Sequence, residues 1–220
     1  QTLLRLDERP TVIALQALDS NMIRLPPTGE VGEVFEITQS QAGSLLVPSA
    51  GGGVDQVSLG DAPALSLVGG TGYSIRFIDD VDFGDRHVLI RGAQIEVAAG
   101  ASLSSAGDLT LFSNNGDISV NGALTVGETL SLDARKQVDL SGVNDEINQK
   151  AEIILGDASQ LQAKRIRLNA LTEGLATRTD GTLEGTELAR IDLGAASLES
   201  TGGGVHVLAE TATRYRSQGV

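Results

Sequence analysis

Four aspartates in the segment "FIDDVDFGDRH" form the densest cluster of possible metal ligands in the sequence: Asp79, Asp80, Asp82 and Asp85. Ca²⁺ prefers carboxylate and carbonyl oxygens and takes about six to eight of them. The segment lacks the glycine and the terminal glutamate of an EF-hand loop, and a solvated acidic turn would have the same composition. The pattern therefore favours an acidic turn and leaves a calcium site as the alternative.

A second set of carboxylates could serve glycoside hydrolysis if the fold aligned them on one face: Asp139, Glu152, Asp192 and Glu199. That reaction needs two carboxylates at a defined separation, and sugar rings are usually held against aromatic faces. The chain has no Trp, and polar outward positions of any repeat align in the same way. We therefore expect no catalytic residues and no enzymatic activity, with a polysaccharide-degrading spike as an alternative.

The histidines and the one glycine-rich loop give little chemistry. His87 and His206 are the only histidines, and we interpret both as solvated surface residues. The stretch "LVGGTGYS", residues 67–74, has no Lys and Ser/Thr at the spacing of a phosphate-binding loop and leads into a strand pattern. We interpret it as a turn between strands.

Basic residues gather at two places. Lys164, Arg165 and Arg167 lie in "AKRIRLN", where a surface salt-bridge ladder is a simpler interpretation than a ligand site. Residues 213–220 form a polar tail with three candidate interface residues, because Tyr and Arg are favoured at interfaces. These residues are Arg214, Tyr215 and Arg216.

Composition excludes several classes of function. The net charge is −13, from 29 acidic and 16 basic residues, whereas nucleic acids require cationic grooves. The chain has no Cys, so no disulfide stabilises it. No apolar run approaches the roughly 20 residues that span a bilayer, and "QTLLRLDERP" at the start has no signal-peptide pattern. We expect a soluble protein with no nucleic-acid partner and no membrane span.

Residues 1–85 carry short β-patterned runs between turn-rich gaps. "EVFEIT", "SLLVPS", "ALSLV" and "YSIRFI" alternate with "LPPTGEVG", "VPSAGGGVD" and "LGDAPA". Short strands at close spacing with Gly and Pro between them are typical of antiparallel modules. The pattern predicts a β-sandwich-like module over residues 1–85.

From about His87 the sequence becomes an internal repeat. Each unit has an apolar-x-apolar tripeptide, a small residue or Gly, and a second such tripeptide. Units begin near Ile95, Ile118, Val138, Ala151 and Ala189. The last two share A-x-I-x-L-G-x-A-S at an offset of 38 residues, which we interpret as two periods of 19, with "LTEGLATRTDGTLEGTELA" as a drifted copy between them.

This alternation places Ile, Val and Leu on one face and polar residues on the other. A unit of about 20 residues cannot bury its apolar face alone, but the next unit can cover it. The sequence therefore predicts an all-β fold: the N-terminal module followed by a parallel β-solenoid of about five or six coils over residues 86–212. The segment "VNDEINQK", residues 143–150, interrupts the period and is predicted to protrude as a loop.

Two families share these phrases. "AGASLSSAGDLTL", "NGDISVNGALTVGETLSL" and "QVDLSG" resemble coils of filamentous-haemagglutinin-type β-solenoids in secreted bacterial adhesins. "GDISVNGALTVGETLSL" is also similar to segments of bacteriophage tail fibres and spikes. The likeness covers about residues 90–210. "MIRLPPTGEVGEVFEITQSQAGSLLVPSAGGG", followed by "ALSLVGGTGYSIRFID", resembles a small β module of phage fibre and other virion proteins.

The second likeness implies a structural protein of a bacteriophage virion, such as a tail fibre, a spike or a capsid decoration. Such proteins are typically homotrimers that contact other virion proteins and act by assembly and display. The alternative is a segment of a secreted adhesin, located extracellularly or at the bacterial cell surface, that binds cell-surface glycans.

Overall fold

The computed structural model describes residues 20–25, 34–49, 53–69, 74–140, 146–177 and 184–216. Within these ranges the chain forms sixteen β-strands and no helix, which confirms the prediction of an all-β protein. No helix in these ranges is therefore long and apolar enough to cross a membrane.

The strands follow the alternating segments of the sequence. The first seven are β1 (Ser20–Arg24), β2 (Val34–Gln41), β3 (Ser44–Pro48), β4 (Val54–Ser58), β5 (Ala64–Val68), β6 (Ser74–Phe77) and β7 (Val81–Asp82). The remaining nine are β8 (His87–Val97), β9 (Ser102–Ser105), β10 (Leu109–Val120), β11 (Ala123–Val126), β12 (Thr129–Leu140), β13 (Glu146–Leu155), β14 (Gln160–Thr177), β15 (Glu184–Asp192) and β16 (Ser197–Arg216).

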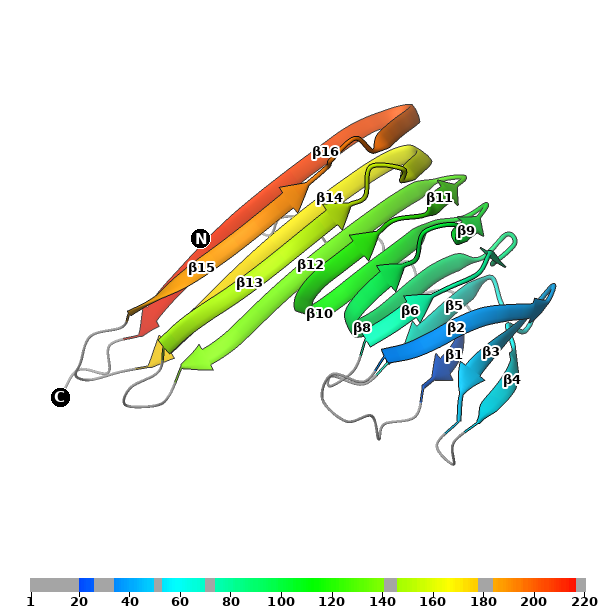
Figure 1. Ribbon diagram of the computed structural model, residues 1–220, viewed down its shortest axis with the longest axis horizontal. Coiled ribbons are helices and arrows are strands. Elements are labelled where there is room, and N and C mark those ends of the chain that lie inside the picture. The colour runs from blue at the N-terminus through cyan, green and yellow to red at the C-terminus, as the bar shows by residue number, and fades with distance from the viewer. Residues whose placement is uncertain are drawn as a thin grey trace.

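Most neighbouring strands are parallel, and they stack in three ladders (Figure 1). The first ladder runs β1, β5, β8, β10, β12, β14, β16. The second runs β2, β6, β8, β10, β13, β15. The third runs β7, β9, β11, β14, β16. We call one passage of the chain through these ladders a rung.

Alternation along each strand sends one set of side chains into the space between the ladders. In the second ladder one inward row of register partners is Ile on every strand from β6 onward: Ile75, Ile95, Ile118, Ile153 and Ile191. The buried residues form one cluster that runs from Ile23 in β1 to Leu168 in β14. From β1 to β14, successive rungs therefore bury their apolar side chains against one another.

The strands of residues 20–85 differ from an antiparallel sandwich. β1 pairs with β5 and β2 with β6, both in parallel. β5 and β6 each pair with β8 as well, so the ladders continue past residue 85 without a domain boundary between the strands. Only β2–β3 and β3–β4 are antiparallel. The turn-rich gaps resemble hairpin loops in the sequence, but β1 and β2, and likewise β5 and β6, are consecutive strands that belong to different ladders.

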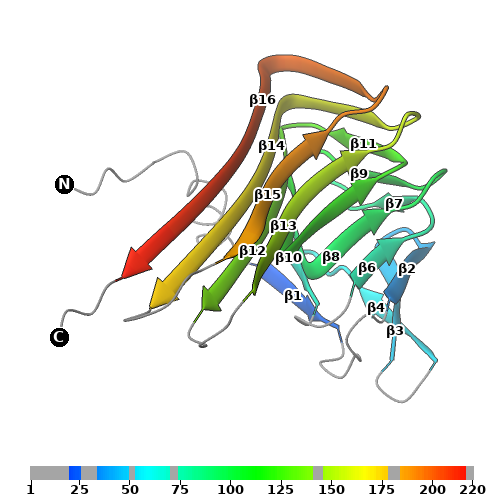
Figure 2. The ribbon, with the colours of Figure 1, turned by 60° about the vertical axis from the view of Figure 1, so that its left-hand side comes forward.

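Five later strands have segments that continue beyond the core. Residues 135–140 of β12 pair with 171–176 of β14, and 171–177 pair with 210–216 of β16. Residues 146–150 of β13 pair with 184–188 of β15. We call these five segments the extension, and it projects from the stack in Figures 1 and 2.

The extension corrects two predictions. Ile118 pairs with Ile153, and Ile153 with Ile191, so the offset of 38 residues is one long rung and not two periods of 19. The described residues of the "drifted copy", 171–177 and 184–189, belong to β14 and β15 and do not form a separate coil. The loop predicted over residues 143–150 is wrong for residues 146–150, which belong to β13, and residues 143–145 lie outside the described ranges.

Candidate functional site

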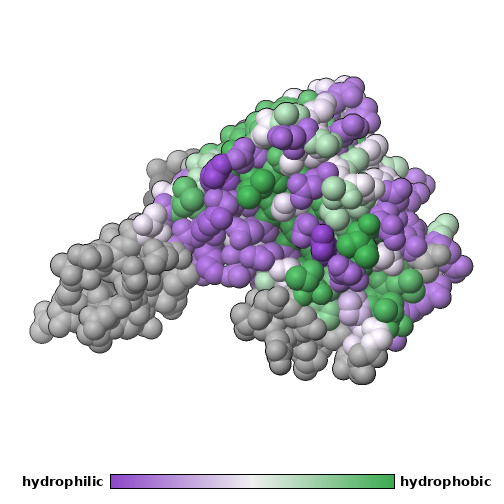
Figure 3. All heavy atoms as spheres, in the orientation of Figure 1, coloured by the Kyte–Doolittle hydropathy of each residue, from purple (hydrophilic) through white to green (hydrophobic). Residues whose placement is uncertain are grey.

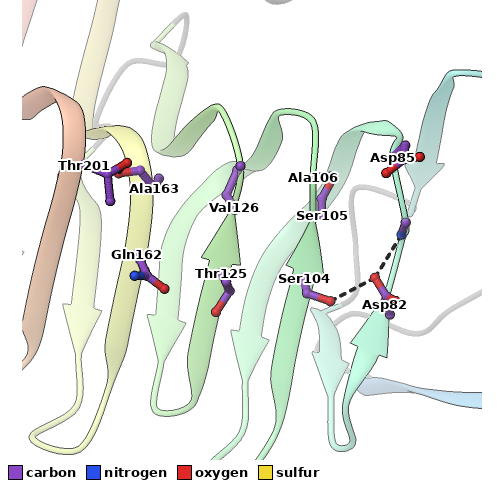
Figure 4. Close-up of a pocket in the computed structure, with 12 residues that line it drawn as sticks. Asp82, Asp85, Ser104, Ser105, Ala106, Thr125, Val126, Gln162, Ala163 and Thr201 are labelled. Carbon is purple, nitrogen blue, oxygen red and sulfur yellow. Dashed lines mark hydrogen bonds between the residues drawn. The ribbon is translucent and has the colours of Figure 1, made fainter.

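A row of polar side chains follows the outer side of the third ladder. Register partners on successive strands are Asp82, Ser104, Thr125, Gln162 and Glu199. The residue before each of the first four is apolar and buried, which fixes this row on the outside: Val81, Leu103, Leu124 and Leu161. Figure 4 shows the first four polar side chains along neighbouring strands.

A shallow groove of about 490 Å³ lies along this row. Its other wall is the corner between the third and first ladders, where the side chains are small and include Ala106, Gly127 and Ala163 (Figure 4). A Cβ at Gly127 would lie 2.1 Å from the carbonyl oxygen of Ala106, so backbone packs directly on backbone there. The groove is therefore bounded by closely stacked main chain.

Hydrogen bonds fix both ends of the row. Ser104 Oγ and Gly84 N donate to Asp82 Oδ1 at 3.0 and 2.9 Å. At the other end, Gln162 Nε2 donates to Glu199 Oε2 at 3.3 Å. Thr125, between them, is exposed. The groove thus offers carboxylate, hydroxyl and amide groups that suit a polar ligand, although none of its lining residues is aromatic.

Of the four aspartates considered as calcium ligands, Asp82 and Asp85 line this groove. Asp79, Asp80 and Asp85 are exposed, as is Asp82, and Ser102 Oγ donates to Asp80 Oδ1 at 2.7 Å. Among the residues that the structure describes, no three His, Cys, Asp or Glu side chains are arranged to hold a metal ion. Asp80 and Asp82 therefore accept hydrogen bonds from serine hydroxyls, and the four carboxylates are not brought together as a ligand set.

The carboxylates considered for glycoside hydrolysis are distributed over different ladders. Asp139 lies on the first ladder, Glu152 and Asp192 on the second, and Glu199 on the third. Glu152 forms an ion pair with Lys150, and Asp192 forms one with Arg190. The four carboxylates therefore do not align on one face, because the long rungs shift their relative positions.

The other predicted residues occupy structural positions. Arg214, Tyr215 and Arg216 end the backbone of β16, beside Leu175–Thr177 of β14. His206 is exposed on β16, as expected. His87 differs, because its Nδ1 lies 2.9 Å from Asp108 Oδ2 and its side chain is partly buried.

In the basic cluster, Lys164 Nζ lies 3.0 Å from Glu128 Oε2 on the preceding rung. Both side chains are more than half exposed, so this pair contributes little to stability. The proposed turn at residues 67–74 falls partly on residues 70–73, which lie outside the described ranges.

Sequence reasoning missed a cluster on the outer side of the second ladder. Asp117 and Glu152 are register partners on β10 and β13. Gln94 Nε2 donates to Asp117 Oδ2 at 3.0 Å, and Ser74 Oγ donates to Gln94 Oε1 at 2.9 Å. The two acidic residues are far apart in the sequence, and only the length of the extended rung would have shown that they meet.

The environment of Asp117 raises its pKa above the ordinary value of 3.8. Burial is the largest cause; Lys150 lowers the pKa, the Glu152 carboxylate raises it, and Lys136 lowers it. The folded protein therefore holds this proton more tightly than the unfolded chain does. The free energy of unfolding then falls as pH rises from 3.8 through the raised pKa, and the ionised Asp117 destabilises the fold above that range.

We expect Asp117→Asn to be as stable as the parent or more stable at pH 7, because the amide oxygen can still accept from Gln94. Its stability should also decline less between pH 4 and 7. Urea denaturation across this range measures both effects. Asp85→Asn, an exposed site, is the control. A variant less stable at pH 7 with an unchanged pH dependence would show that the charge of Asp117 stabilises the fold.

No protein-family model matches the chain, and searches of curated proteins and of solved structures return no significant match.

Proposed function

We propose that this chain is a parallel β-solenoid of about five or six coils that serves as a structural component, acting by assembly and display and not by turnover. The observation that carries this proposal is the single apolar core, which runs through successive rungs from β1 to β14. A stack of this kind is a stiff, extended support in which each rung contacts its neighbours.

The sequence likeness favours a bacteriophage virion as the place of this component, as a fibre, a spike or a capsid decoration. Homotrimers and contacts with other virion proteins are part of the same proposal. The chain has a net charge of −13, and such an acidic excess favours the solubility of a display protein.

Immunoelectron microscopy tests this role directly. Antibodies raised against the purified chain should label virions at a fixed position. Labelling of the bacterial cell surface in the absence of phage would contradict the virion assignment and favour the adhesin. Parallel assays with bacterial polysaccharides should show no depolymerisation, and release of oligosaccharides would contradict a purely structural role.

A second candidate function is supported by the groove of the third ladder. We propose, as the alternative, a segment of a secreted adhesin whose groove binds a cell-surface glycan. Ser104, Thr125 and Gln162 supply hydroxyl and amide groups in one line, which can exchange hydrogen bonds with successive sugar hydroxyls.

For this candidate we expect Thr125→Arg to weaken glycan binding by at least about tenfold, because the longer side chain fills the middle of the groove. A glycan array with the parent chain identifies the ligand, and titration compares the variants. Gln56→Arg adds the same charge at an exposed position of β4 and should leave binding unchanged. Equal glycan binding by both variants would show that the groove is not the glycan-binding site.

A further inference from the structure

Charge is divided unevenly between the outer faces of the three ladders. On the first ladder, two rows of outward residues flank the buried inward row that includes Leu111. The register partners in these two rows are Met22, Ser66, Leu89, Thr110, Ser131, Arg167 and His206, and Arg24, Val68, Arg91, Phe112, Asp133, Asn169 and Leu208. We call these residues the basic face. Three of them are arginines, and Asp133 is the only acidic residue among them.

The corresponding rows of the other two ladders are acidic. On the second ladder, the outward rows that begin at Val34 and Glu36 contain five acidic and two basic residues: Glu36, Glu96, Asp117, Glu152 and Asp192, with Arg76 and Arg190. Figure 3 shows hydrophilic residues over much of this face, in the orientation of Figure 1. On the third ladder, the polar row contains Asp82 and Glu199 and no basic residue. The basic face is therefore a local exception in a chain of net charge −13.

Contacts within the basic face orient its arginines without cancelling their charge. The Arg91 guanidinium carbon lies 5.5 Å from the centre of the Phe112 ring, and that of Arg135, two residues after Asp133, lies 5.6 Å from it. A cation–π contact leaves the N–H donors of a guanidinium available for a ligand.

The one acidic residue of the face is already neutralised. Arg135 Nε and Nη2 donate to the two carboxylate oxygens of Asp133 at 2.9 and 2.7 Å. Within the described residues, neither Arg24 nor Arg91 forms an ion pair, and both are exposed. The positive charge of these two arginines is therefore available to an anionic partner.

We propose that the basic face binds a linear polysaccharide that carries spaced carboxylate groups. The planar guanidinium group matches a carboxylate in a bidentate contact. Arg24 and Arg91 lie two strands apart on the ladder, at β1 and β8, which corresponds to about 9–10 Å. A polysaccharide with a carboxylate on every second sugar spaces its charges at a similar distance, so it can run across the strands and meet both arginines.

The same spacing disfavours a nucleic acid. One strand of B-DNA carries a phosphate about every 3.4 Å, so about three phosphates would lie over the interval between Arg24 and Arg91. The acidic rows of the second and third ladders would repel this excess of negative charge. The basic face is separate from the groove of the third ladder, and its ligand does not depend on a virion or an adhesin role.

Titration with hyaluronan oligosaccharides, which carry a carboxylate on every second sugar, tests this site. The parent chain should bind them at low salt with a dissociation constant below about 1 mM, and added salt should weaken the binding because exposed charges are screened. Carboxyl-reduced oligosaccharides of the same length have no charge and should not bind. Arg24→Gln/Arg91→Gln should weaken hyaluronan binding at least about tenfold, because it removes two donors of charge-assisted hydrogen bonds.

The control variant is Arg76→Gln/Arg190→Gln, which removes the same two charges from the outer face of the second ladder. It should bind hyaluronan as the parent does, and circular dichroism checks that both variants keep their β structure. No binding by the parent, equal binding of the carboxyl-reduced oligosaccharide, or equal weakening in the two variants would overturn the proposal.

Two further measurements distinguish other occupants of the basic face. Tighter binding of single-stranded DNA than of hyaluronan would overturn the proposal and assign the face to a nucleic acid. Sedimentation analysis of the parent and both variants tests self-association. An oligomer that only Arg24→Gln/Arg91→Gln dissociates would assign the face to a neighbouring copy of the chain and would equally overturn the polysaccharide site.

Discussion

Replacing Ile153 with alanine is expected to lower the free energy of unfolding by about 2–5 kcal/mol. Ile153 is 0% exposed and lies between Ile118 and Ile191 in the inward row of the second ladder. The substitution removes buried methyl groups and leaves a cavity between rungs, which the fixed spacing of the hydrogen-bonded strands prevents from closing. Urea denaturation at pH 7 measures the loss.

The neighbouring residue supplies the control. Ile154 points outward and is 40% exposed, so Ile154→Ala deletes the same atoms at an adjacent position on the same strand. We expect it to change stability by no more than about 1 kcal/mol. Equal losses for the two variants would contradict the inward and outward assignment of β13, and with it the register of the second ladder.

The second large effect is expected at Gly116. Its φ is +109°, and a Cβ there would lie 2.1 Å from the carbonyl oxygen of Lys150. Gly116 lies where β10 turns from the first ladder into the second, between the paired segments that end at Ser113 and begin at Asp117. Gly116→Ala should therefore combine backbone strain with a main-chain clash and cost about 3 kcal/mol or more.

Gly100 separates these two causes. Its φ is +82°, but a Cβ there would meet no atom within 4 Å. Gly100→Ala should thus show the backbone strain alone, about 1 kcal/mol. Thermal unfolding of both variants gives the comparison, and a loss at Gly116 no greater than at Gly100 would mean that β10 and β13 move apart easily.

Alternation of apolar residues was sufficient to predict the strands and part of their stacking. Ile95, Ile118, Ile153 and Ile191 are in register as the repeat predicts. The local pattern identifies which residues face inward because side chains alternate along any strand. It does not reveal how far a strand continues before the chain turns. The repeat therefore predicts a new unit at Val138, whereas this residue lies within β12 and pairs with Gly174 of β14.

The candidate site was harder to predict for the same reason. Asp82 is one of four clustered aspartates in the sequence, but Ser104 and Thr125, which lie beside it in the groove, are common residues of the short strands β9 and β11 and have no distinctive pattern. Asp117 and Glu152 meet only because one rung is long. A site formed across rungs depends on register, and register depends on rung lengths that the period alone does not give.

The extension also constrains how this protein can change in length. Residues 171–177 of β14 have strands on both sides, residues 135–140 and 210–216, and residues 146–150 pair with 184–188. An insertion in one rung alone would project main-chain groups with no neighbour to bond, and a deletion in one rung would strip its neighbours of theirs. Length variation at this edge should therefore be inherited as a matched set across adjacent rungs, so that rung length is a property of the whole sheet.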